Sequence, residues 1–63
     1  MNKAIKPRNL RVGDQSGSFT LASISEYKVD TRGYITTWST PKGLQVMFLK
    51  ANDFVGIDYF ARV

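Results

Sequence analysis

Clusters of turn-forming residues interrupt this chain about every ten residues, and their spacing constrains its fold more than any other feature. The clusters lie at residues 13–18, 30–33, 40–43 and 51–53. The segments between them are rich in β-branched and aromatic residues. No window longer than about ten residues keeps the apolar spacing of an amphipathic helix. The sequence therefore predicts short antiparallel strands joined by tight turns.

The expected strands cover residues 9–12, 19–29, 34–39, 44–51 and 55–63. A bulge near Ala22–Ser23 would bring Leu21 and Ile24 to one side of the second strand. Apolar residues on both faces of 44–51 indicate a central strand, or one that is covered on both sides. The expected core consists of Leu21, Ile24, Val46, Phe48, Ile57 and at least one of Ile35 and Trp38.

Two glycines are expected to close hairpin loops. Gly33 follows the polar residues 30–32, and Gly43 ends the turn that begins at Thr40-Pro41. Both positions favour a positive φ, which glycine adopts without steric cost.

The size and residue inventory narrow the function. A chain of 63 residues forms one domain, whose core rarely supplies more than about 3–5 kcal/mol. Cysteine and histidine are both absent. The sequence therefore offers no disulfide, no zinc ligands and no histidine or cysteine for catalysis. We expect Asp53 to cap a turn and Asp58 to face solvent from a strand, rather than the two to act as a catalytic pair. The chain is predicted not to be an enzyme and to use no cofactor or metal.

Positive charge is concentrated at the start of the chain. Residues 1–12 contain no acid and four bases, which are Lys3, Lys6, Arg8 and Arg11. The other five bases balance the five acids, so the net charge of +4 comes from this segment. The sequence predicts a flexible basic arm over residues 1–8 and a single small β domain over residues 9–63. A basic arm on a neutral body is typical of a protein that meets a polyanion. The alternative interpretation is a solvated leader that only aids solubility.

A pair of aromatic residues gives a second candidate for binding. Tyr34 and Trp38 share one face of an ideal strand, and Ile35 lies on the other face. If Ile35 points inward, Tyr34 and Trp38 form an outer platform on which nucleic-acid bases stack. The same pair would also suit a protein interface. In the alternative arrangement, Trp38 lies in the core and Ile35 lies outside.

The strand order, the turn Arg11-Val12-Gly13-Asp14 and the single-turn signal before the last strand resemble the general plan of SH3-like barrels. No site residue is transferred from that resemblance. The predicted fold class is all-β. Its architecture is expected to be a small five-stranded antiparallel SH3/OB-like barrel or a strongly bent meander.

These observations lead to two hypotheses about function. The first is a small nucleic-acid-binding accessory protein that contacts single strands or the phosphate backbone, with DNA and RNA both open. Its expected site residues are Lys3, Lys6, Arg8, Arg11, Tyr34 and Trp38. The alternative is a small protein-binding module or inhibitor that docks on a larger protein, or a homo-oligomer. Without a signal-peptide core, a membrane-length apolar run or a disulfide framework, the expected location is cytoplasmic, with no membrane partner.

Overall fold

The computed structural model describes residues 3–27 and 33–61, and this part of the chain is all-β. Its elements, in chain order, are β1 (Lys3–Ile5), the 3₁₀ turn η1 (Pro7–Asn9), β2 (Gln15–Ser16), β3 (Phe19–Tyr27), β4 (Gly33–Thr40), β5 (Gly43–Lys50) and β6 (Val55–Ile57). Within the described residues, no helix has the length and hydrophobicity needed to cross a membrane.

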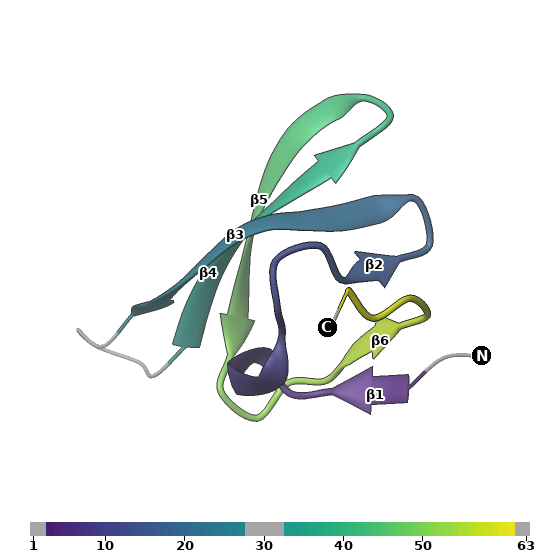
Figure 1. Ribbon diagram of the computed structural model, residues 1–63. Coiled ribbons are helices and arrows are strands. Elements are labelled where there is room, and N and C mark those ends of the chain that lie inside the picture. Colours follow the sequence, from purple (N-terminus) through teal and green to yellow (C-terminus); the bar gives the residue numbers. More distant parts are fainter. Residues whose placement is uncertain (1–2, 28–32, 62–63) are drawn as a thin grey trace.

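The strands form two antiparallel sheets (Figure 1). One contains four strands in the order β2-β3-β4-β5, and the other pairs β1 with β6. An isolated bridge between Gln15 of β2 and Tyr59, in the segment that follows β6, links the two sheets. The described strands do not close into a barrel, because β5 pairs with β4 on one side only. The described residues form six strands in two sheets, where five strands were expected.

The bulge in β3 is confirmed. The pairing of β3 with β4 shifts between Leu21 and Ser23, so one extra residue stands on β3. This shift lets Leu21 and Ile24 both face the core, where Leu21 is 1% exposed and Ile24 packs against the buried cluster.

The two hairpin glycines differ from each other. Gly43 has a φ of 111°, as predicted. Gly33 does not have a positive φ, so that prediction is wrong, and residues 30–32 lie outside the described part. A Cβ on Gly33 would lie 2.8 Å from the Leu49 carbonyl oxygen and 2.9 Å from Phe48 Cε1. Glycine is needed here because there is no space for a side chain.

The core lies between the two sheets and consists of Leu10, Leu21, Trp38, Leu49 and Ile57. Trp38 is only 2% exposed. Its indole Nε1 donates a hydrogen bond of 2.7 Å to Thr36 Oγ1, which in turn donates one of 2.8 Å to the Met47 carbonyl oxygen. This chain satisfies the polar atoms that the inner face of β4 buries.

The predicted burial of Val46 and Phe48 is wrong. Val46 is 71% exposed and Phe48 is 44% exposed. Ile35 stands opposite Phe48, and directly opposite residues on paired strands share a face. Because Trp38 points inward, strand alternation sends Ile35, Val46 and Phe48 outward together.

The N-terminal segment also requires a correction. The described residues of the predicted flexible arm belong to the folded body, since β1 pairs with β6 from Lys3↔Ile57 to Ile5↔Val55. Pro7 is buried and Ile5 packs against the core. The strand predicted over residues 9–12 is instead the end of η1 and a turn. Apolar residues placed between the bases anchor this segment.

The last strand is shorter than predicted, because β6 ends at Ile57. The Asp58 backbone N–H donates to the Gln15 carbonyl oxygen at 2.9 Å, and its carboxylate accepts a bond of 3.0 Å from the Gly17 N–H. These bonds turn the chain from its partner β1 toward β2.

Candidate nucleic-acid interface

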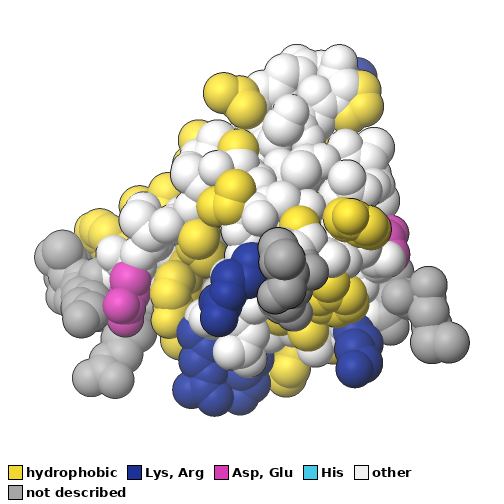
Figure 2. All heavy atoms as spheres, in the orientation of Figure 1, with side chains coloured by type: hydrophobic (Ala, Val, Ile, Leu, Met, Phe, Trp, Pro, Cys, Tyr) yellow, Lys and Arg dark blue, Asp and Glu magenta, His cyan; other side chains and the backbone are white. Residues whose placement is uncertain are grey.

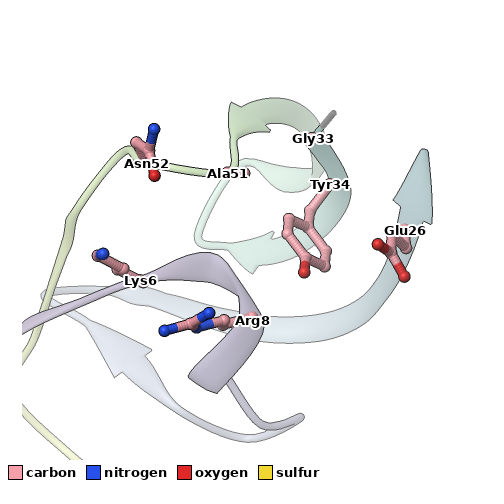
Figure 3. A pocket seen from close by; sticks show the side chains of 7 residues that line it. All are labelled: Lys6, Arg8, Glu26, Gly33, Tyr34, Ala51 and Asn52. Atoms are coloured by element: carbon pink, nitrogen blue, oxygen red, sulfur yellow. The ribbon is translucent and has the colours of Figure 1, made fainter. Parts of the chain in front are cut away.

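A polar pocket of about 190 Å³ lies where the N-terminal segment meets one end of the four-stranded sheet (Figure 3). It brings together residues from η1 and its entry, from β3 and β4, and from the turn after β5. The lining residues are Lys6, Arg8, Glu26, Gly33, Tyr34, Ala51 and Asn52.

Pro7 positions the two basic residues of this pocket. It is buried at the start of η1, with Lys6 before it and Arg8 after it. The turn is closed by the Asn9 N–H, which donates to the Lys6 carbonyl oxygen at 2.9 Å, and by the Leu10 N–H, which donates to the Pro7 carbonyl oxygen at 3.1 Å. The ring of Pro7 also fixes φ. Two cationic side chains are thus held on a short, anchored turn.

Tyr34 and Glu26 form the opposite wall. They stand directly opposite each other where β3 pairs with β4. In Figure 3 the Tyr34 ring projects from β4 into the space between Arg8 and Glu26. The pocket therefore combines two cations and a phenol hydroxyl with one carboxylate at its margin.

The turn after β5 supplies Asn52. Two hydrogen bonds between Lys50 and Asp53 close this turn. The Lys50 N–H donates to Asp53 Oδ2 at 2.9 Å, and the Asp53 N–H donates to the Lys50 carbonyl oxygen at 3.0 Å. Asp53 thus caps a turn, as predicted, and presents the Asn52 amide to the pocket.

An exposed aromatic ring lies beside the pocket. Lys6 Nζ is 5.7 Å from the centroid of the Phe54 ring, within cation–π range. Phe54 is 63% exposed. Sequence reasoning missed both Phe54 and Asn52 as site residues. The available signal was a large aromatic residue directly after the polar turn 51–53, a place where burial is uncommon.

The structure brings together three of the predicted site residues, which are Lys6, Arg8 and Tyr34. Lys3 is exposed on β1 but does not line the pocket. Arg11 is exposed, and its Nη1 donates to the Leu10 carbonyl oxygen at 3.3 Å. Trp38 is buried, so the outer platform of Tyr34 and Trp38 does not form. The two do share a face of β4, but it is the inner one.

Charge is distributed unevenly over the surface. In Figure 2, Lys and Arg side chains gather in the lower part of the view, over the N-terminal segment, and acidic side chains lie toward the margins. Three of the acids bind backbone N–H groups. Asp14 accepts from Arg11 and Ala61, Asp53 from Lys50, and Asp58 from Gly17. In residues 3–27 and 33–61, no group of three or more acidic side chains is placed to hold a metal ion.

Comparison with known proteins adds no homologue, since no family model, no curated protein and no solved structure matches this chain.

Proposed function

We propose that this protein is a small accessory protein that binds single-stranded nucleic acid. One backbone phosphate occupies the pocket beside Lys6 and Arg8, and an adjacent base stacks on Phe54. The observation that carries the proposal is the anchored pair of cations beside an exposed aromatic ring.

The donors in the pocket suit a phosphate group. A guanidinium can make two parallel hydrogen bonds to phosphate oxygens, and an ammonium supplies a compact positive charge. The Tyr34 hydroxyl and the Asn52 amide add uncharged donors. Glu26 also lines the pocket and offsets one of the two positive charges, so the pocket suits no more than one phosphate.

The exposed ring favours a single strand over a duplex. In a duplex the faces of the bases are covered by their neighbours, whereas an unpaired base is free to stack on an aromatic side chain. Such stacking tolerates any sequence, because every base has a π-face. Phe54 thus takes the role that the sequence suggested for Trp38.

The fold supports the same proposal, and we propose a cytoplasmic location with it. We infer that the two sheets, connected through Gln15 and Tyr59, are an opened form of the SH3/OB-like barrel expected from the sequence. Small barrels of the OB type commonly bind single strands. A cytoplasmic protein would have access to such ligands.

The proposal is tested by fluorescence anisotropy with a labelled oligothymidylate over a range of NaCl concentrations. Lys6→Gln and Arg8→Gln should each make the log–log salt slope shallower by about 0.7, the value for one phosphate contact on a single strand. Phe54→Leu should weaken binding by roughly 1–3 kcal/mol and leave the slope unchanged, because stacking releases no counterions.

Lys42→Gln is the matched control, since Lys42 is an exposed lysine at the other end of the β4–β5 hairpin. It removes the same charge without touching the pocket. The proposal fails if the parent protein does not bind any oligonucleotide at low salt. It also fails if Lys42→Gln lowers the slope as much as Lys6→Gln.

A further inference from the structure

The outer face of the β4–β5 hairpin is apolar and uncovered. Leu44 is 70% exposed and Val46 is 71% exposed, and they alternate with Phe48 along β5 at 44% exposure. Ile35 extends this patch onto β4 at 37% exposure. Four contiguous apolar side chains on one sheet face are more typical of an interface than of a free surface.

One residue of this patch, Phe48, is fixed by contacts with its neighbours. The Phe48 ring makes an edge-on contact with Tyr27, with ring centroids 6.0 Å apart and an interplanar angle of 87°. It also lies against Gly33, where a side chain would collide with it. Phe48 is therefore held in place although much of its surface remains open.

The patch borders an unpaired sheet edge. Among the described strands, β5 pairs with β4 alone, so its other edge presents free backbone donors and acceptors. Natural edge strands are usually protected by charges, proline or bulges. Residues 43–49 contain no charge and no proline, and the pairing of β5 with β4 is continuous.

Charge is restricted to the two ends of this strand. Lys42 precedes β5, Lys50 ends it, and both are exposed. The neighbouring strand β4 carries no charged residue. A strand added to this edge would meet a neutral apolar centre between two positive ends.

A second copy of this chain fits that pattern poorly. Antiparallel self-pairing centred on Val46 would set Leu44 opposite Phe48, but at both ends it would also bring Lys42, in the turn before β5, near Lys50 of the other copy. Shifting the pairing by two residues in either direction keeps the apolar side chains on the same face. It then places a charged lysine against an apolar side chain, either Lys50 against Leu44 or Lys42 near Phe48. Like charges directly opposite each other are destabilising in a sheet.

We propose that β5 binds an extended segment of a partner protein, which adds to the sheet as a further strand. The partner segment carries apolar residues at alternate positions and an acidic residue at each end, spaced to meet Lys42 and Lys50. Backbone hydrogen bonds supply affinity in this mode of recognition, and the alternating side chains and end charges supply specificity.

A designed pair of peptides provides the test. The first has nine residues, with glutamate at both ends and alternating threonine and valine between them, so that the valines face Leu44, Val46 and Phe48. The control peptide has lysine at both ends. Binding is measured as the anisotropy of a label on each peptide. The glutamate peptide should bind about tenfold more tightly, from two attractive cross-strand pairs against two repulsive ones.

The charge-reversed variant Lys42→Glu/Lys50→Glu should prefer the lysine peptide instead. Both positions are exposed, and the melting curve of the variant checks that it folds. The proposal is overturned if neither peptide binds, or if the preference does not reverse. It is also overturned if sedimentation shows a dimer of the parent that Val46→Lys abolishes, because a second copy would then occupy this face.

Discussion

The buried carboxylate of Asp14 should be the most sensitive polar group in this fold. Asp14 is 0% exposed. Its Oδ2 accepts a hydrogen bond of 3.0 Å from the Arg11 N–H, and its Oδ1 accepts one of 3.0 Å from the Ala61 N–H. One side chain thus closes the turn after η1 and ties the end of the described chain to it.

The expected cost follows from these two bonds. Hydrogen bonds to a charged group contribute about 1.5–3 kcal/mol each. Asp14→Ala loses both and leaves two N–H groups without that acceptor, so it should cost about 3–6 kcal/mol. That range is comparable to the roughly 3–5 kcal/mol that a core of this size supplies. Asp14→Ala should therefore be largely unfolded at 25 °C.

Asp14→Asn provides a graded comparison. Its amide keeps one acceptor oxygen and places an NH₂ donor against the other backbone N–H. It should cost about 1.5–3 kcal/mol, which at about 4–8 °C per kcal/mol lowers Tm by roughly 6–24 °C. Urea and thermal unfolding can be followed by the fluorescence of Trp38, the single tryptophan, which is buried.

Asp53→Ala is the control, because Asp53 accepts one hydrogen bond in an exposed turn. It should cost about 0.5–1.5 kcal/mol. An unfolding free energy of Asp14→Ala within about 1 kcal/mol of the parent value would refute the structural role assigned to this carboxylate.

Three further predictions concern stability and are checked by the same unfolding assay. Gly33→Ala should destabilise the protein more than Gly43→Ala, because the new Cβ at Gly33 collides with the backbone. Gly43→Ala should cost roughly 1 kcal/mol because of the positive φ at this position. Equal losses of stability in the two variants would contradict the steric argument. Leu21→Ala should cost about 2–5 kcal/mol, as for a fully buried leucine. Phe48→Ala should cost less than the roughly 3–5 kcal/mol lost on truncating a buried phenylalanine, because Phe48 is 44% exposed. A greater loss of stability than for Leu21→Ala would show that Phe48 supports the core.

Local turn chemistry made part of this fold predictable. Gly43 and the bulge between Leu21 and Ser23 follow from short-range patterns, and both are confirmed. Each depends on a few neighbouring residues and on backbone sterics. Such features do not require knowledge of which elements pack together.

Which of the two faces of each strand points into the core was harder to predict. On β5, the alternating residues Val46 and Phe48 are as apolar as Met47 and Leu49 on the other face. Periodicity alone cannot choose between two apolar faces. The choice depends on tertiary packing, because Trp38 lies in the buried cluster with Leu10, Leu21, Leu49 and Ile57 from other parts of the chain.

The candidate site was predicted only in part, for a similar reason. The bases Lys6 and Arg8 were visible in the sequence, but the buried position of Pro7 between them was not. Phe54 follows Lys6 by many residues and reaches it only because the turn after β5 lies beside η1. Long-range proximity of this kind has no signature in one sequence.

Binding of nucleic acid at the pocket beside η1 can be located residue by residue. The most direct measurement is an NMR titration of the ¹⁵N-labelled protein with oligothymidylate, following the backbone amides. We expect the largest shift changes to cluster at Lys6, Arg8, Tyr34, Asn52 and Phe54, with little change along β5. Changes confined to β5, or no changes at low salt, would contradict it.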